Sequence, residues 1–266
     1  MKIRILADNT TFIDQYYLGE PALSLYIEEG ERKILFDTGY SDVLIRNAEK
    51  MGIDLRKITD VVLSHGHNDH TGGLVYLRDY VSHARLIAHP SCFEEKEDQG
   101  LPVGSPLSLE EVREMFEEVL LTEHPYAVTP SLTFLGEIPR IHSFEGKPVG
   151  RHKVNGRWVP DLCIDDSALS YESEEGIFVI SGCAHSGIAN ILDYAKKLSG
   201  RKIRGVLGGF HLLKADEDAR KTVEYLKKEG IAELYPCHCV SNTCRYLMFK
   251  EKLPVQDAGV GMEIEV

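Results

Sequence analysis

Residues 64–74, SHGHNDHTGGL, place three histidines and an aspartate within six consecutive positions. Burying three imidazoles side by side is costly unless a cation or hydrogen-bonding partners satisfy their ring nitrogens. The short run at 60–63 that precedes this stretch is typical of a buried strand, and Thr71-Gly72-Gly73 is typical of a turn into a helix. The stretch therefore predicts a metal-binding loop at the end of a strand.

The spacing within this loop fits two ions better than one. His65 and His67 are two positions apart, so in an extended chain they project to the same side. Asp69 and His70 follow after the chain begins to turn and can point at a neighbouring position. Imidazole nitrogen and carboxylate oxygen are donors typical of catalytic zinc, with manganese or iron as alternatives. The alternative is a metal-free polar loop with solvated histidines, and we take metal binding as the working hypothesis.

Four segments in chain order resemble motifs of the metallo-β-lactamase superfamily: residues 34–39 (ILFDTG), 65–70 (HGHNDH), 177–185 (IFVISGCAH) and 235–238 (YPCH). The second resembles the first metal motif of that superfamily, and the fourth its last metal-ligand strand end. The third occupies the place of a strand that normally ends in Gly-Asp. The resemblance implies an α/β fold, the four-layer αββα sandwich. It also implies one domain over 1–266, and we expect a lid-like excursion at about 91–160.

Three segments narrow the resemblance to one branch of the superfamily. Residues 64–74, 182–191 and 208–212 are similar to the branch that contains dihydropterin-ribofuranosylaminobenzene phosphate synthase-like proteins. The chain departs from that branch at 18–22 (LGEPA), where Glu-His-Gly is usual, and at 239–241 (CVS), where Cys-Thr-Gly is usual. Both departures lie where substrate contacts can differ, so the resemblance leaves the reaction open.

The candidate site residues fall into groups according to their expected role. The predicted metal ligands are His65, His67, Asp69, His70, His185 and His238. Asp69 is also the predicted catalytic residue, because it would orient the attacking water. Possible ligands, or residues that support ligands, are Asp37, Asp165, Asp166 and Cys183. We expect His211 to line the substrate pocket, and the remaining histidines, His83, His89, His124, His142 and His152, to be surface or structural.

Composition is that of an ordinary globular enzyme, with 266 residues of which 43% are hydrophobic and 27% charged. A net charge of −12 argues against a nucleic-acid partner, since binding a phosphate backbone needs a dominant basic face. No apolar run approaches the ~20 residues that span a bilayer, and no signal peptide is recognisable. We therefore expect a cytoplasmic protein without a membrane partner.

The six cysteines have no regular spacing and are expected to be reduced thiols. A structural zinc site at Cys237, Cys239 and Cys244 is disfavoured, because His238 between them already belongs to the main candidate site.

Hydrophobic periodicity predicts two strand-rich halves, each followed by helices, which suits two sheets with helices outside. The expected strands are 2–8, 22–29, 32–37, 60–64, 167–172, 176–182, 203–208, 232–236 and 259–265. The expected helices are 41–51, 188–199 and 216–229, the last closed by Gly230.

The middle third, residues 91–160, has a weaker pattern. A capping-box sequence at 108–111 predicts a helix that runs to about Glu118. Residues 146–158 then carry four Lys or Arg and no acid in an otherwise acidic chain. As a binding loop, this basic stretch would attract an anionic group such as phosphate through Lys147, Arg151, Lys153 and Arg157. The alternative is a solvated loop whose charges are incidental.

A bound divalent metal lowers the pKa of its water and polarises a carbonyl or phosphoryl oxygen, so hydrolysis is the simplest expectation. We expect one or two ions per chain, zinc first with manganese or iron as alternatives, and a small, anionic, phosphorylated substrate. One rival is a pterin-type transferase that displaces diphosphate to join a dihydropterin to an arylamine ribose phosphate. A non-catalytic metal-binding sensor is the third possibility.

Overall fold

The computed structural model describes all 266 residues, and the chain forms two compact units. The first unit comprises residues 1–123, 149–161 and 259–266. The second comprises residues 124–148 and 162–258. Each unit contains its own sheet and its own buried apolar cluster.

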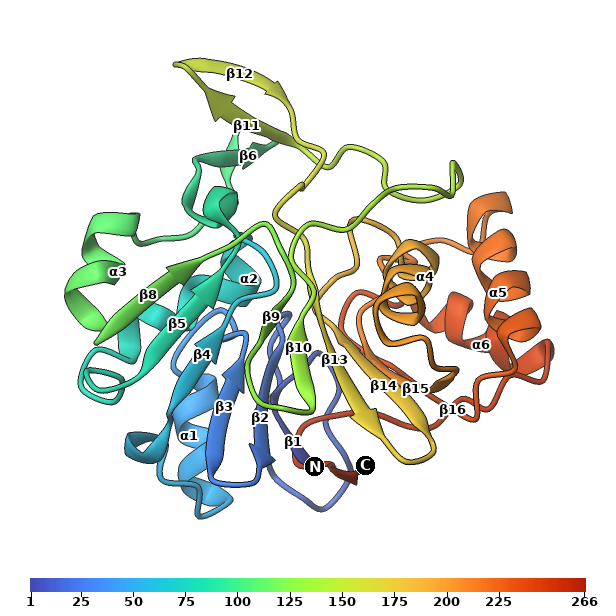
Figure 1. Ribbon diagram of the computed structural model, residues 1–266, viewed down its shortest axis with the longest axis horizontal. Helices are drawn as coiled ribbons and strands as arrows, with labels where there is room; N and C mark the ends of the chain where they lie inside the picture. The colour runs from blue at the N-terminus through green and yellow to red at the C-terminus, as the bar shows by residue number, and fades with distance from the viewer. The chain divides into compact units, whose positions relative to one another are not determined.

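A seven-stranded sheet, in the order β17-β1-β2-β3-β4-β5-β8, organises the first unit (Figure 1). Its strands are β1 (Lys2–Ala7), β2 (Ser24–Glu29), β3 (Arg32–Phe36), β4 (Asp60–Val62), β5 (Arg85–Ala88), β8 (Glu118–Leu121) and β17 (Glu263–Glu265). Pairing is antiparallel from β17 to β3 and parallel from β3 to β8. Because β3 and β4 are parallel, the loops that follow them leave the same edge of the sheet.

Helix α1 (Val43–Lys50) covers the first sheet by burying Leu44 and Ala48. Helix α3 (Leu109–Met115) begins with a complete capping box, in which Ser108 and Glu111 satisfy each other's backbone N–H groups. The helix expected to reach Glu118 therefore ends earlier than predicted, and Glu118 instead begins the parallel edge strand β8.

A second, four-stranded sheet of the first unit has the order β12-β11-β6-β7. It is formed by β6 (Lys96–Asp98), β7 (Leu101–Pro102), β11 (Arg151–Val154) and β12 (Arg157–Pro160). The β11–β12 hairpin projects from this unit at the top of Figure 1. The basic stretch is therefore largely a β-hairpin.

The second unit is built on a six-stranded sheet in the order β16-β15-β14-β13-β10-β9. Its strands are β9 (Tyr126–Ala127), β10 (Leu132–Phe134), β13 (Ala168–Ser173), β14 (Gly176–Ser181), β15 (Ile203–Gly208) and β16 (Glu233–Pro236). Strands β14, β15 and β16 are parallel, so their carboxyl ends meet at one edge. The sheet and its helices share an apolar cluster that includes Val179, Ile191 and Val206.

Three helices follow the parallel strands: α4 (Ile188–Ser199), α5 (Glu217–Glu229) and α6 (Asn242–Lys250). The Asp216 side chain accepts a hydrogen bond from Ala219 N and caps α5, and left-handed Gly200 and Gly230 end α4 and α5. Helix α6 was not among the predicted elements. No helix of the chain combines the length and the apolar character needed to cross a bilayer.

Candidate metal centre

The histidine-rich loop of the first unit follows β4 and is almost completely buried. His65 and His70 have no exposed surface, and His67 is 7% exposed. His65 Nε2 lies 3.1 Å from His67 Nδ1, so two ring nitrogens face each other, as ligands of one ion do. His70 Nε2 and Asp69 Oδ2, 3.7 Å apart, form a second pair in the short helix α2 (Asn68–Thr71). The structure thus brings His65 close to His67 and Asp69 close to His70, and the rings of His65 and His70 also lie with centroids 4.2 Å apart.

A buried carboxylate, that of Asp37, is hydrogen-bonded to this loop. Its Oδ1 accepts a hydrogen bond from Ser64 N, and its Oδ2 accepts bonds from Ser64 Oγ and His70 Nδ1, each 2.7 Å long. Because a carboxylate only accepts, His70 Nδ1 carries the proton and its Nε2 presents a lone pair. Asp37 therefore holds Ser64 and His70 in place, which is the contact that a residue supporting the candidate ligands would make.

Two glycines let the loop lie directly against the segment that follows β3. A Cβ on Gly73 would lie 1.9 Å from Thr38 O, and one on Gly72 would lie 2.4 Å from Tyr40 O. Thr38 N donates to His70 O at 2.7 Å. The sequence Thr71-Gly72-Gly73 is thus required for close approach of the two backbones as well as for the turn.

The small sheet of the first unit is also bonded to this loop. Asn68 N donates to Val103 O at 2.8 Å, and His67 forms an isolated bridge with Gly104. At the base of the sheet, Lys96 Nζ and Asp161 Oδ2 form a buried ion pair of 2.8 Å. Asp161 also offers an oxygen within 4.8 Å of a His67 ring nitrogen. Nothing in the sequence indicates Asp161, since neither its spacing from the other candidate ligands nor its neighbours in the chain identify it as part of a metal site.

In the second unit, the carboxyl ends of three neighbouring parallel strands carry cysteine and histidine. Cys183 and His185 follow β14, His211 follows β15, and His238 and Cys239 follow β16. His238 Nε2 lies 3.2 Å from Cys183 Sγ. The donor atoms of Cys183, His185 and His211 all lie within 4.8 Å of one another.

Cys239 belongs to the same cluster, although sequence reasoning gave it no role in the main site. Its Sγ accepts a hydrogen bond from His211 N at 3.2 Å and lies 3.4 Å from Cys183 O. Burial raises the pKa of the Cys239 thiol, but hydrogen bonds with the Cys183 and His211 side chains and the charge of His238 outweigh burial. The pKa therefore lies well below its ordinary value.

A second buried carboxylate, Asp166, supports the loop after β14. Its Oδ2 accepts hydrogen bonds from Ser186 N at 2.9 Å and from Ser186 Oγ at 2.5 Å. Burial, only partly offset by these bonds, raises the pKa of Asp166 to about 6. Asp166 thus holds the residue beside His185 much as Asp37 holds Ser64 beside His65. Asp165 is also fully buried.

These residues fit divalent metal ions. Each unit brings pairs of donor atoms close together: His65 with His67 and His70 with Asp69 in the first unit, and His238 with Cys183 in the second. All of these side chains except that of Asp69 are buried, which is costly without a cation. In the first unit, Asp37 keeps the proton of His70 on Nδ1, so that Nε2 is the nitrogen facing Asp69. The chain therefore contains side-chain clusters able to hold a metal ion.

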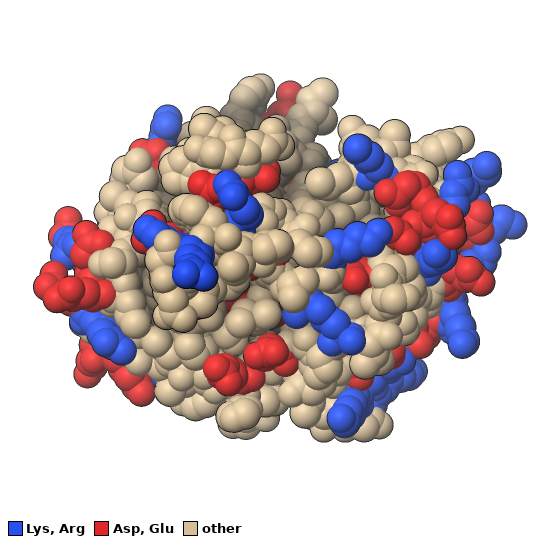
Figure 2. Space-filling model, turned by 90° about the horizontal axis from the view of Figure 1, so that it is seen from above, with Lys and Arg blue, Asp and Glu red and all other residues tan.

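The four predicted substrate-binding cations are placed differently from one another. Lys147 pairs with Asp218 in the second unit, and in the first unit Arg151 pairs with Glu97 and Lys153 with Glu95. Arg157 has no ion pair. On the face shown in Figure 2, basic and acidic side chains are likewise interspersed.

The histidines expected to be surface or structural have ordinary surroundings. His83 and His124 are exposed, and buried His89 accepts a hydrogen bond from Ser91 N. His142 and His152 pair with Asp193 and Glu94, respectively.

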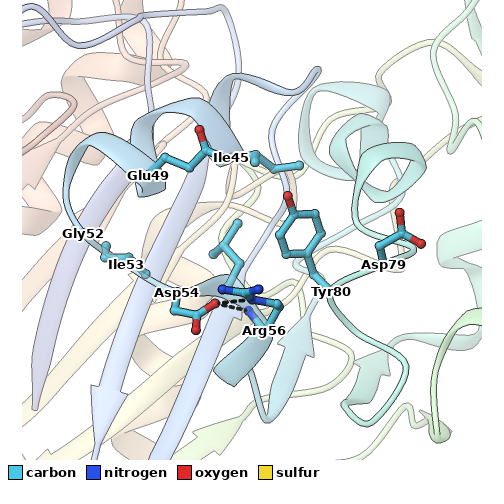
Figure 3. Close-up of a pocket in the computed structure, with 9 residues that line it drawn as sticks. Ile45, Glu49, Gly52, Ile53, Asp54, Arg56, Asp79 and Tyr80 are labelled. Carbon is cyan, nitrogen blue, oxygen red and sulfur yellow. Dashed lines mark hydrogen bonds and ion pairs between the residues drawn. The ribbon is translucent and has the colours of Figure 1, made fainter.

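One open cavity of about 500 Å³ lies in the first unit, between the end of α1, residues 52–56 and Tyr80 (Figure 3). Its lining includes the Asp54–Arg56 ion pair, 2.8 Å long, and no histidine or cysteine. This cavity therefore differs in chemistry from the metal-binding clusters.

Comparison with known proteins places these observations in context. Residues 18–238 match the metallo-beta-lactamase superfamily. The chain is 31% identical over 268 residues to 7,8-dihydropterin-6-methyl-4-(beta-D-ribofuranosyl)-aminobenzene-5'-phosphate synthase of Methanocaldococcus jannaschii, covering 94% of this chain and 91% of the relative. An uncharacterised protein of the same organism is 33% identical over 239 residues, covering 89% and 90%.

A solved structure agrees with these matches. The crystal structure of Tm1679, described as a metal-dependent hydrolase of the beta-lactamase superfamily, has a TM-score of 0.88 and 31% identity, with 100% of this chain and 99% of that chain covered. The match confirms the predicted α/β fold class.

Proposed function

Because this chain belongs to the metallo-β-lactamase superfamily, we propose that it is a metal-dependent hydrolase of a small phosphorylated substrate. The observation that carries the proposal is the pair of buried ring nitrogens, His65 Nε2 and His67 Nδ1, which lie 3.1 Å apart in the loop that also carries Asp69. We further propose that the chain works as a single domain with one or two ions, zinc first, held by His65, His67, Asp69, His70, His185 and His238.

Divalent ions bound by these residues would supply a Lewis acid and an activated water near neutral pH. The protein's own contribution is orientation. Asp37 keeps the proton of His70 on Nδ1, and the side chain of Asp69, 29% exposed, is accessible enough to accept a proton from an attacking water. Gly72 and Gly73 keep the loop rigid against the strand beside it, which preserves this geometry.

The test uses metal-free protein reloaded separately with zinc, manganese or iron and assayed on phosphodiesters, diphosphates, lactones and thioesters. We expect hydrolysis that depends on the added metal. Asp69→Asn should lower kcat strongly, whereas Asp79→Asn, an exposed carboxylate in the same unit, should leave kcat unchanged. Stoichiometric metal binding without turnover of any substrate class would contradict the hydrolase and favour the sensor.

The synthase named above favours a second candidate, transfer instead of hydrolysis. In that reaction the carbon–oxygen bond to diphosphate breaks, a bond from the same carbon to an arylamine ribose phosphate forms, and the acceptor loses a proton to a carboxylate such as Asp69. Supplying a dihydropterin diphosphate with the acceptor tests this directly. A condensed product with release of diphosphate would replace the hydrolase assignment.

We propose that the substrate carries a phosphate, since the product named for that relative carries one. The basic stretch would attract such a group, and His211 would line the pocket. An anion would have to compete with Glu97 for Arg151 and with Glu95 for Lys153. Arg157 has no ion pair. It is therefore the residue of the hairpin best able to bind the phosphate of a substrate.

A further inference from the structure

We propose that the buried ion pair of Lys96 and Asp161 orients His67, one of the proposed metal ligands. Asp161 accepts the proton on His67 Nε2, which leaves Nδ1 as the ligand atom, and Lys96 holds the Asp161 carboxylate in place. Both are positioning residues, because they act through His67. The inference rests on the proposed function in one respect, since His67 is among the ligands proposed there.

The protons of the other two histidines in the histidine-rich loop have identifiable acceptors. His65 Nδ1 lies 2.9 Å from Ser64 Oγ. Ser64 has a single hydroxyl proton, which it donates to the Asp37 carboxylate, so Ser64 Oγ accepts the proton of His65 Nδ1. Asp37 accepts the proton of His70 Nδ1 directly. Each of these two imidazoles is therefore left with an unprotonated Nε2.

His67 faces the cluster through its other ring nitrogen. Its Nδ1 lies 3.1 Å from His65 Nε2, so Nδ1 is the atom that joins the donor pair. A neutral imidazole that offers Nδ1 to a metal carries its proton on Nε2. His67 Nε2 is buried, and a buried N–H is costly unless an acceptor is at hand. An oxygen of Asp161 lies within 4.8 Å of a His67 ring nitrogen, which places Asp161 to be that acceptor.

Lys96 holds the carboxylate of Asp161. Lys96 Nζ lies 2.8 Å from Asp161 Oδ2, and each side chain is only 2% exposed. A carboxylate accepts at both oxygens, so Asp161 can also take the proton of His67. A buried ion pair adds little net stability, because the cost of removing both charges from water offsets their attraction. Placement of a neighbouring group therefore explains this pair better than stability does.

The backbone that carries Lys96 is hydrogen-bonded to the histidine-rich loop through residues 103–104. Val103 N donates to Lys96 O at 3.0 Å, and Asn68 N donates to Val103 O at 2.8 Å. Gly104 forms the isolated bridge with His67. A Cβ on Gly104 would lie 3.0 Å from Lys96 N, so glycine permits this close approach. The spacing between Lys96 and His67 is therefore set by backbone contacts.

Asp161 is held by the segment that precedes β11. Val149 N donates to Asp161 O at 2.8 Å, and Asp161 N donates to Gly150 O at 3.2 Å. A Cβ on Gly150 would lie 2.4 Å from Glu97 O, so this segment lies directly against β6. The ion pair thus joins two segments that are each fixed by their own backbone contacts.

The first test locates the proton in metal-free, full-length protein whose histidines carry ¹⁵N. Long-range proton–nitrogen NMR spectra, recorded at a pH where neutral imidazole predominates, distinguish protonated from unprotonated ring nitrogens. His67→Gln identifies the His67 signals by their loss. We expect His67 to be protonated at Nε2 and unprotonated at Nδ1. Protonation at Nδ1 would overturn the inference, and this measurement needs no change to the ion pair.

The second test removes both charges together. Lys96→Met combined with Asp161→Leu replaces the pair by apolar side chains, an exchange that often leaves stability intact. We expect this double variant to unfold near the urea concentration of the parent. It should lose the preference of His67 for protonation at Nε2, because leucine accepts no hydrogen bond. It should also bind zinc at least tenfold more weakly in competition with a chelator.

Lys33→Met is the matched control, because it removes another ion-paired lysine of the same unit, the partner of Glu28. It should leave the His67 signals and the zinc affinity unchanged.

An unchanged His67 tautomer, with zinc affinity within twofold of the parent, in the folded double variant would overturn the positioning role and leave the proposed metal-dependent function standing. Failure of the parent to bind any divalent ion would overturn the proposed function instead, and the proton position on His67 in metal-free protein would still decide this inference.

Discussion

Replacing Asp37 by Asn tests whether the metal loop depends on a buried hydrogen-bond acceptor beneath it. The carboxylate accepts three bonds, two from Ser64 and one from His70 Nδ1. Asn has nearly the same shape and tolerates the left-handed backbone at this position, where φ is 57°. The substitution therefore changes one oxygen to an amino group and little else.

The orientation of the side-chain amide in Asp37→Asn determines which ring nitrogen of His70 carries the proton. With its NH₂ in the place of Oδ1, it would face Ser64 N–H, donor against donor. With its NH₂ in the place of Oδ2, it can donate to Ser64 Oγ and to His70 Nδ1. The second orientation is favoured, and it forces the His70 proton from Nδ1 to Nε2. His70 then has no lone pair to offer at Nε2.

The expected free-energy costs distinguish an effect on metal binding from an effect on folding. Loss of a residue that orients a ligand typically costs 10–100-fold in metal affinity, or about 1.4–2.8 kcal/mol. Asp37→Asn keeps most of its hydrogen bonds and should destabilise the fold by only about 1–2 kcal/mol. Asp37→Ala leaves three buried donors without an acceptor at about 1–3 kcal/mol each and should threaten folding itself.

The assays are zinc competition against a chromophoric chelator and urea unfolding of the metal-free protein. Asp37→Asn should fold and should lose at least tenfold in affinity at one metal position. Zinc affinity within twofold of the parent, in protein that unfolds at the parent's urea concentration, would refute the assignment of Asp37 as the residue that sets the His70 tautomer.

Four further substitutions test other parts of the structure. Gly73→Ala should displace the metal loop by more than 1 Å, because its Cβ would lie 1.9 Å from Thr38 O, and should lower metal content in an elemental assay. Gly200→Ala, which meets no atom within 4 Å, should cost only about 1 kcal/mol of backbone strain and keep the metal. Burial raises the pKa of Glu145, so its contribution to stability is lost as pH rises through that value. Glu145→Gln should therefore gain stability relative to the parent between pH 4 and pH 8 in urea unfolding, and an equal difference at both pH values would contradict this. Arg157→Ala should raise KM for a phosphorylated substrate at unchanged kcat, and an unaltered KM would assign the hairpin to the solvated surface.

Most of the fold could be predicted where the apolar pattern is long and periodic. The helix expected at 188–199 has those bounds in the structure, and the strands expected at 176–182 and 203–208 differ by at most one residue. The strands within 91–160 were not predicted, because they are only two to four residues long and few of their side chains are fully buried. Some of these strands also pair with residues far along the chain, as β11 does with β6 and β10 with β13, and local periodicity carries no signal for such pairing.

The metal loop was predictable because its residues are consecutive, so spacing alone places their side chains. Asp37 could be predicted through the resemblance, and its bonds confirm that it supports the loop. Cys239 and Asp161 could not be predicted in this way. Each gains its neighbours only when a strand end or a small sheet brings distant segments together. Local sequence gives no signal for such contacts.

Several residues in or beside the side-chain clusters have a left-handed backbone conformation, as do some residues elsewhere in the chain. Asp37, Ala184, His211 and His238 all have φ between 47° and 57°, although each has a Cβ. Such a residue costs about 1–2 kcal/mol compared with the right-handed conformation, and it persists only where its surroundings hold it. Here the holding contacts are identifiable: Ser64 and His70 for Asp37, and the sulfur of Cys239 for His211. The strained residues occur at strand ends, where the chain must turn sharply to aim a donor atom. At these four residues the strain is best explained as the cost of positioning candidate metal ligands and the residues beside them.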